Sequence, residues 1–169
     1  MEPVEIVMRP ASPTIALRAR IGMLKMARVM GSSYRAMLEQ LERRGLKPDG
    51  APYARYTGID WADLGSQGKL SSLLGVFTRK WNVEMGLPLA EPLPPADGFA
   101  AGCLPAGRYV QTLHCGAYHK VSCAYERLQD LARREGLRLG PESIEIYLND
   151  PRTTARAELE TLVLIPLLD

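Results

Sequence analysis

The sequence predicts an α+β fold made of two copies of one small module, each with the order strand, helix, strand, strand. Three features of the chain predict it. Two amphipathic helical segments share a tyrosine and a terminal glycine when they are laid over each other at an offset of 91 residues. Segments with strand-like alternation flank each helix, and a proline-rich stretch separates the halves. Self-similarity at so long a period is typical of a duplicated module rather than a solenoid.

The first helical segment, residues 32–45, reads SSYRAMLEQLERRG. Ser32 or Ser33 is available as an N-cap residue, and Gly45 suits the position just after a helix end. One apolar stripe follows at helical spacing: Tyr34, Met37, Leu38 and Leu41. Residues 22–30 continue this period, and we expect them to form a separate turn hinged at Gly31.

The second helical segment, residues 120–136, reads KVSCAYERLQDLARREG and ends at Gly136. Its apolar stripe consists of Val121, Ala124, Tyr125, Leu128 and Ala132. The offset of 91 aligns Tyr34 with Tyr125, Arg43 with Arg134, Gly45 with Gly136, Leu46 with Leu137 and, further along, Tyr56 with Tyr147.

The segments around the helices alternate like strands. In 142–151, ESIEIYLNDP, one side carries Ile144, Ile146 and Leu148, and the other carries Glu145, Tyr147 and Asn149. Residues 85–89 match 163–167, and residues 15–22 match 109–116. We therefore place a first βαββ module at 1–89, a stiff linker at 90–98 and a second module at 99–169, within a single domain over 1–169.

One helix covers only one face of a three-stranded sheet, so each module leaves a bare face that needs a cover. We expect the two bare faces to turn toward a common groove. Strand parity assigns Glu145, Tyr147 and Tyr56 to that groove, together with Glu84. The same parity gives a core side to Trp81, Val83, Met85 and Leu87. The sequence thus predicts two carboxylates, Glu145 and Glu84, in one groove lined by two tyrosines.

The composition is that of an ordinary globular protein, and it argues against several functions. A formal net charge of +2 gives no support for direct nucleic-acid binding, and no apolar run approaches the roughly 18 residues of a membrane span. The N-terminus lacks the layout of a signal peptide, and three cysteines, an odd number, favour free thiols in the cytoplasm. His119 and Cys123 share a helix face that a metal could use, but a free cysteine is commonly a small buried hydrophobe and a single imidazole usually caps or packs. No metal and no cofactor are predicted.

The string LPAGRYVQTLHCGAYHKVSCAYERL, with SIEIYLNDPRTTARAELETLVLIPL after it, resembles the GyrI-like effector-binding domain. This family includes the ligand-sensing parts of BmrR-type and Rob/AraC-type transcription regulators and stand-alone gyrase-inhibitory proteins. The resemblance implies two tandem, SHS2-like βαββ modules around a central cleft for small, aromatic or cationic, apolar molecules. It also implies an acidic residue in the cleft at Glu145. No helix-turn-helix lies outside the matched region, so we expect a sensing domain without its DNA-reading partner.

On these grounds we expect a stand-alone domain that senses or sequesters apolar aromatic xenobiotics, in the manner of multidrug-binding domains. The candidate ligand-binding residues are Glu145, Tyr147, Tyr56, Glu84, Tyr53, Trp61 and His114. The acid supplies charge, and aromatic faces attract cations. A plainer interpretation pairs Glu145 with Arg18, Arg20 or His114 on a wet surface. The connection 57–76 either folds over the cleft, with Trp61 as its wall, or is a surface extension.

Two other functions stay open. The resemblance includes hydrolases that open cyclopropane-bearing DNA-alkylating compounds, for which Glu145 would act as general base and Tyr147 would steady the leaving oxygen. It also includes inhibitors of DNA gyrase, which act by protein–protein contact. A transcription regulator and DNA gyrase are therefore the candidate macromolecular partners.

Overall fold

In the computed structural model, which describes residues 3–62, 79–94 and 98–168, the two halves of the chain share one antiparallel sheet. Eight strands follow the order β1-β6-β9-β8-β3-β4-β2-β5, and β7 pairs with β9. The strands are β1 (Val4–Arg9), β2 (Ser12–Gly22), β3 (Tyr53–Thr57), β4 (Lys80–Pro88), β5 (Ala100–Leu104), β6 (Gly107–Cys115), β7 (Arg138–Leu139), β8 (Glu142–Tyr147) and β9 (Glu160–Leu168). The helices α1 (Met23–Arg43) and α4 (Ser122–Glu135) and the 3₁₀ helices η1 (Tyr118–Lys120) and η2 (Arg156–Glu158) accompany them. The predicted α+β class is confirmed.

Each half of the chain runs through strand, helix, strand and strand. In the first half these are β2, α1, β3 and β4, and in the second half they are β6, α4, β8 and β9. The equivalent strands β3 and β8 pair with each other at the middle of the sheet. An approximate twofold axis therefore passes between them.

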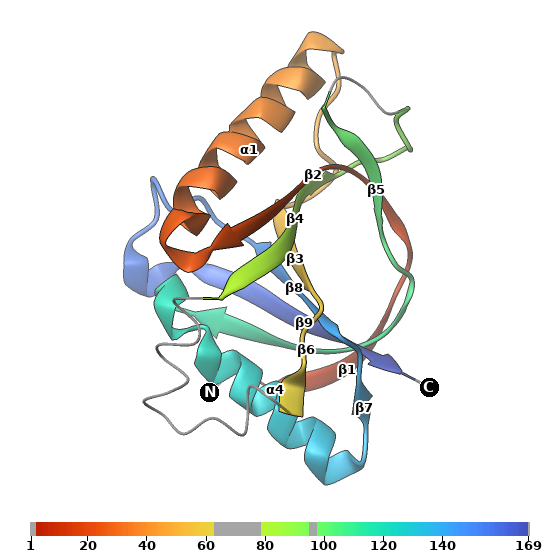
Figure 1. Ribbon diagram of the computed structural model, residues 1–169, viewed down its shortest axis with the longest axis vertical. Coiled ribbons are helices and arrows are strands. Elements are labelled where there is room, and N and C mark those ends of the chain that lie inside the picture. Colours follow the sequence, from red (N-terminus) through yellow and green to blue (C-terminus); the bar gives the residue numbers. More distant parts are fainter. Residues whose placement is uncertain (1–2, 63–78, 95–97, 169) are drawn as a thin grey trace.

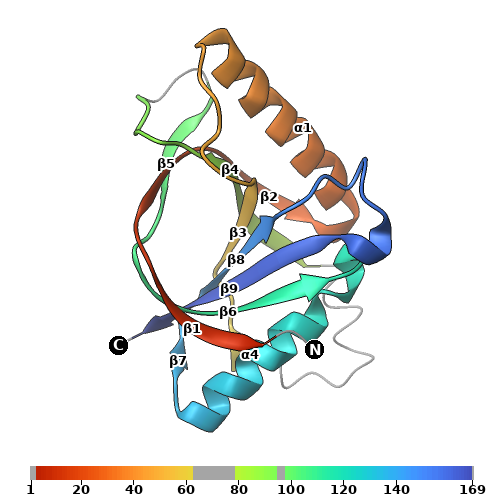
Figure 2. The ribbon, with the colours of Figure 1, turned by 180° about the vertical axis from the view of Figure 1, so that it is seen from behind.

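The strand that precedes each half crosses to the other half. β1 leads into β2 but pairs with β6, and β5 leads into β6 but pairs with β2. This exchange links the two ends of the sheet through the chain itself, and the sheet curls into an open barrel (Figures 1 and 2).

Both helices cover the outer, convex face of the curled sheet (Figure 1). Met37 and Leu41 of α1 are buried in a cluster with Met85 and other residues of the first half. Leu128 of α4 is buried in a second cluster with Val163 of the second half. The inner, concave face carries a third cluster made of Tyr53, Tyr109, Ile144 and Leu164. The sheet is thus buried on both faces.

Helix α1 differs from its prediction in two ways. It is a single helix from Met23 to Arg43 that passes through Gly31 without a break, so the separate turn predicted at 22–30 is wrong. The Ser32 hydroxyl donates to the carbonyl oxygen of Val29 instead of capping a new helix. The apolar stripe is nevertheless sufficient for packing, because Met37 and Leu41 are buried, although Leu38 stays 45% exposed. Gly45 and Gly136 take the left-handed conformation expected after each helix end.

The predicted assignment of faces is right for β4, where Met85 lies on the core side and Glu84 on the side without helices, but it is wrong for Glu145. Glu145 pairs with Ala54 on one side and Val163 on the other, and Ala54 pairs with Met85. Directly paired residues project to the same face of a sheet, so Glu145 shares the helix-covered face with Met85. The bare faces of the modules do not enclose it. Since β8 is buried on both faces, its alternation could not reveal which side the helices cover.

The predicted alignment of residues 15–22 with residues 109–116 is shifted by one residue from the equivalence that the structure shows. Leu17 pairs with Met85, and Thr112 pairs with Val163 at the equivalent place in the second half. Because side chains alternate with a period of two, this slip reverses the faces. His114 therefore lies on the face of Glu145, whereas Arg18 and Arg20 lie on the inner face.

The helices in the described ranges include none that combines the length and the apolar character needed to cross a membrane.

Candidate functional site

Glu145 occupies a buried place at the centre of the molecule, on the outer face of β8 near the approximate twofold axis. Only 8% of the residue is exposed. Both oxygens of its carboxylate accept hydrogen bonds from tyrosines. The Tyr125 hydroxyl donates to Oε1 at 2.8 Å, and the Tyr147 hydroxyl donates to Oε2 at 2.9 Å. The first tyrosine comes from α4 and the second from β8 itself.

More aromatic rings surround this acid. The Tyr34 ring of α1 lies edge-on to that of Tyr147, with 6.5 Å between their centroids. The Tyr118 ring of η1 meets the same Tyr147 ring at 5.5 Å. Tyr56 of β3 lies close enough to Glu145 for the two to interact electrostatically. We call Tyr34, Tyr56, Tyr118, Tyr125 and Tyr147 the tyrosine cluster. It draws on both halves of the chain, so the site forms only when the halves assemble.

Burial sets the electrostatics of the cluster. It raises the pKa of Glu145 above its usual range, and hydrogen bonds from Tyr125 and Tyr147, with the nearby His114, offset part of that rise. Burial and the charge of Glu145 together raise the pKa of Tyr125 and of Tyr147. Both phenols therefore remain protonated and able to donate to the carboxylate.

Tyr125 makes a second hydrogen bond, with the hydroxyl of the buried Ser143 at 3.1 Å. An ionised carboxylate can only accept, so the single hydroxyl proton of Tyr125 points to Glu145. While Glu145 is ionised, Ser143 therefore donates to the oxygen of Tyr125. The three groups form a directed chain that ends on the acid.

Trp61 packs behind Tyr125. Their ring centroids are 6.0 Å apart, and the indole Nε1 donates to the carbonyl oxygen of Gly140 at 2.7 Å. Trp61 therefore lies one ring away from Glu145, as part of the wall behind the cluster. Most of the 57–76 connection, from residue 63 onward, falls outside the described residues, as do residues 95–97 of the predicted linker.

His114 is buried on the same face as Glu145. Its Nε2 lies 3.2 Å from the carbonyl oxygen of Ala117, at the turn that leads into η1. Its neighbour in the sheet, Thr161, has a buried hydroxyl that finds no partner among the described residues. These groups give the second half a polar patch beside the cluster.

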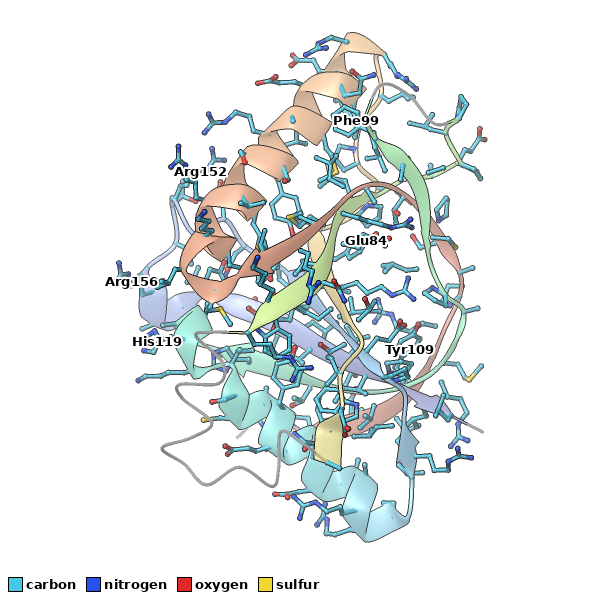
Figure 3. The ribbon with its side chains drawn as sticks, viewed as in Figure 1. Glu84, Phe99, Tyr109, His119, Arg152 and Arg156 are labelled. Atoms are coloured by element: carbon cyan, nitrogen blue, oxygen red, sulfur yellow. The ribbon has the colours of Figure 1, made fainter. Side chains whose placement is uncertain are left out.

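Glu84 and Tyr53, which were predicted to share the groove with Glu145, lie on the opposite face of the sheet. The Tyr53 hydroxyl donates to Oε1 of Glu84 at 3.0 Å, and Arg18 Nε lies 2.7 Å from Oε2 of the same residue. Arg55 adds a longer contact of 4.0 Å to Glu84. Figure 3 places Glu84 inside the curl of the sheet. The structure does not bring the two acids together. Glu145 lies on the same face as Met85, and Glu84, the residue next to Met85 in β4, points to the opposite face because consecutive residues of a strand alternate.

Tyr34, Tyr118, Tyr125 and Ser143 were not among the predicted site residues. The repeat contained a usable signal, since Tyr34 and Tyr125 align at the offset of 91. Both tyrosines had been assigned to the packing stripes of their helices. The stripes do pack, but these two rings lie where the helices approach the axis.

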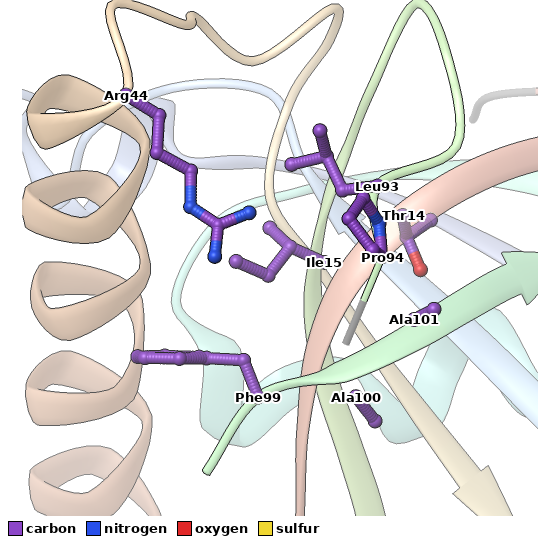
Figure 4. Close-up of a pocket in the computed structure, with 8 residues that line it drawn as sticks. All are labelled: Thr14, Ile15, Arg44, Leu93, Pro94, Phe99, Ala100 and Ala101. Carbon is purple, nitrogen blue, oxygen red and sulfur yellow. The ribbon is translucent and has the colours of Figure 1, made fainter. Parts of the chain in front are cut away.

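A small cavity lies elsewhere, between the end of α1 and β5 (Figure 4). Its walls are Thr14, Ile15, Arg44, Leu93, Pro94, Phe99, Ala100 and Ala101. Its volume is about 10 Å³, the space for about one water molecule, and it touches no member of the tyrosine cluster. In the described parts of the chain, no three His, Cys, Asp or Glu residues gather as a possible metal site.

The fold of this chain is that of a small-molecule-binding domain. Residues 2–168 match the family of GyrI-like small molecule binding domains, and the chain belongs to that family. A search of curated proteins found no match.

Solved structures with the same fold share little sequence with this chain. The EcmrR C-terminal domain superposes with a TM-score of 0.68 at 16% identity, over 100% of this chain and 99% of that one. In a complex of EcmrR with DNA, the TM-score is 0.71 at 14% identity, and this chain spans 57% of the EcmrR chain. SAV2435, solved bound to tetraphenylphosphonium, gives 0.64 at 9% identity over 98% of this chain and 94% of that one. A hydrolase from Listeria innocua gives 0.65 at 14% identity, with coverage of 98% and 91%.

Proposed function

We propose that the tyrosine cluster binds a small, apolar, aromatic cation against the carboxylate of Glu145. One contrast carries this proposal. Glu84 and Glu145 are the two glutamates classed as buried in the described chain, at 6% and 8% exposure. Glu84 is neutralised by Arg18 and Arg55, whereas the hydrogen bonds to Glu145 come from uncharged tyrosines.

A buried carboxylate without a counter-charge is costly, so the fold keeps Glu145 at the expense of stability. A cation bound there would remove that cost. The faces of tyrosine rings also attract cations, and an apolar ligand would exchange water for ring surface. SAV2435, which shares the fold, binds a ligand of this chemistry, tetraphenylphosphonium.

The acid is closed off by the rings around it, so a ligand must displace at least one of them. Tyr118 is the most exposed member, at 37%, and it sits on a three-residue helix that follows Gly116. The proposed entry route therefore passes Tyr118, while Tyr125 and Tyr147 stay on the carboxylate.

Titration with tetraphenylphosphonium at pH 8, followed by the quenching of tyrosine and tryptophan fluorescence, tests the proposal. Triphenylphosphine oxide, an uncharged compound with the same phenyl rings, is the matched ligand. We expect Glu145→Gln to weaken binding of the cation about tenfold or more and to change binding of the neutral compound by no more than about twofold. Glu84→Gln, which removes a buried carboxylate from the other face, should leave both affinities unchanged. Equal affinities of Glu145→Gln and the natural protein for the cation would contradict the proposal.

The biological role that follows is the sensing or sequestration of xenobiotics, as the effector part of a regulatory system. A transcription regulator is the proposed partner. Inhibition of DNA gyrase stays a prediction from the sequence.

Hydrolysis is a second candidate function. It is favoured by one feature, an acid whose pKa burial has raised, next to phenols that can donate to a leaving oxygen. Incubation with a cyclopropane-bearing alkylator, followed by chromatography, tests it. Turnover that disappears in Glu145→Gln would support this function, and an unchanged substrate would refute it for that compound class.

A further inference from the structure

The empty site needs something to balance the charge of Glu145. This question rests on the proposed function, because it concerns the same carboxylate before the cation arrives. Six titratable side chains surround Glu145. They are Tyr34 from α1, Tyr56 from β3, Tyr118 from η1, Tyr125 from α4, Tyr147 from β8 and His114 from β6.

Five of these six groups are phenols, which are neutral at ordinary pH. Among the described residues, no arginine or lysine forms an ion pair with Glu145. His114 is the one basic side chain of the set; its Nε2 lies 3.2 Å from the carbonyl oxygen of Ala117, and in the described chain its ring forms no ion pair with Glu145. The remaining candidate for balancing the charge is a proton on Glu145 itself.

The hydroxyl groups around Glu145 can hydrogen-bond to it both when it is ionised and when it is protonated. When Glu145 is ionised, Ser143 donates to Tyr125, and Tyr125 donates to Oε1. When Oε1 carries a proton, the same contacts serve in reverse, because either oxygen of the Ser143–Tyr125 pair can be the donor. Two hydroxyl rotations accomplish the change, and no side chain has to leave its place.

We propose that this site exchanges a proton for its cation: Glu145 is protonated when the site is empty, and the arriving cation displaces that proton into solvent. The step is balanced in charge. The O–H bond of the carboxylic acid breaks, the proton passes to water or buffer, and the carboxylate and the cation remain as a neutral pair. Burial, which raises the pKa of Glu145, is the physical cause that favours the protonated empty state.

The exchange gives cation binding a defined pH dependence. Below the raised pKa of Glu145, each cation should release about one proton, and the apparent Kd should weaken about tenfold for each unit that the pH falls. Above that pKa the site is already ionised, so release stops and Kd becomes constant. A neutral ligand of the same size should not follow this profile.

Calorimetric titration with tetraphenylphosphonium between pH 5 and pH 8 tests the exchange. At each pH, two buffers with different ionisation enthalpies give the number of protons released. We expect the number of protons released per cation to fall as the pH rises, from a limit of about one. Glu145→Gln should release none at any pH.

His114→Asn is the control for the other titratable group. Release that persists in His114→Asn supports Glu145 as the source, and release that vanishes there while surviving in Glu145→Gln overturns the proposal. Tight binding with a constant Kd and no release across the range also overturns it and leaves the proposed cation site intact. An absence of binding at pH 8, where the exchange costs least, would instead refute the cation site and the exchange with it.

Discussion

Ala54 lies directly opposite Glu145 on the paired strands β3 and β8, and the 91-residue offset that relates the two halves maps one onto the other. The approximate twofold axis therefore passes through this pair. One half supplies an acid there and the other a methyl group, so the symmetric fold has a single charge at its centre. The proposed cation site therefore predicts a stoichiometry of one cation per chain.

The first prediction concerns the stability of the empty protein. An acid whose pKa is raised in the folded state does not lower the free energy of unfolding while it is protonated in both the folded and the unfolded protein. As the pH rises above its unfolded value, near 4.5, the folded state progressively loses stability until the folded pKa is passed. We expect Glu145→Gln to raise the Tm at pH 8, with a smaller gain at pH 4.5. Thermal unfolding at the two values measures this, and a natural protein more stable than the variant at pH 8 would contradict it.

The second prediction separates two equivalent tyrosines. Tyr125 donates to the carboxylate of Glu145, whereas its counterpart Tyr34 donates to the backbone carbonyl oxygen of Tyr53 at 2.7 Å. Tyr125→Phe should disfavour the ionised acid and weaken tetraphenylphosphonium binding at pH 7 about tenfold or more, since a hydrogen bond to a charged group contributes about 1.5–3 kcal/mol. Tyr34→Phe removes a hydroxyl from the same cluster and should change this affinity little. Equal losses in both variants would show that the hydroxyls act only through packing.

The third prediction concerns the inner face. Glu84 is buried between Arg18 and Tyr53, with Arg55 nearby. Glu84→Leu would remove the acceptor of Arg18 and of the Tyr53 hydroxyl, while Arg55 keeps its ion pair with Glu142 at 2.6 Å. Because Arg18 is largely exposed, we expect a loss of about 1 kcal/mol. Urea unfolding should show that loss, while tetraphenylphosphonium affinity at pH 8 stays unchanged. A loss of ligand affinity in a folded variant would mean that the two faces are coupled.

The fourth prediction compares two glycines. A Cβ added at Gly86 would lie 2.5 Å from the ring of the buried Tyr53, so Gly86→Ala should destabilise the protein by about 1–3 kcal/mol. Gly31 lies inside α1 with nothing within 4 Å of an added Cβ. Gly31→Ala should therefore stabilise it by about 0.5–1 kcal/mol. Chemical denaturation of the two variants measures both signs, and a neutral Gly86→Ala would mean that Tyr53 can move aside.

Several parts of the site were open to prediction from sequence. The alternation of 142–151 correctly put Glu145 and Tyr147 on one side of a strand, and the tyrosine hydroxyl does reach that carboxylate. The offset of 91 residues maps Ala54 onto Glu145, and the structure pairs these two residues. Tyr125 was hidden because a tyrosine in an amphipathic stripe has the same spacing whether it only packs or also donates a hydrogen bond.

The sequence by itself determined the α+β class, the two amphipathic helices and the strand–helix–strand–strand order within each half, but not the additional strands β1, β5 and β7. It also determined that Glu145 and Tyr147 lie on the same side of one strand, because local periodicity sets these features. Only the tertiary structure decided which face of the sheet the helices cover, which arginines pair with Glu84 and which hydroxyl groups donate hydrogen bonds to Glu145. Those outcomes depend on the register between strands far apart in the chain, where a shift of one residue reverses every side chain.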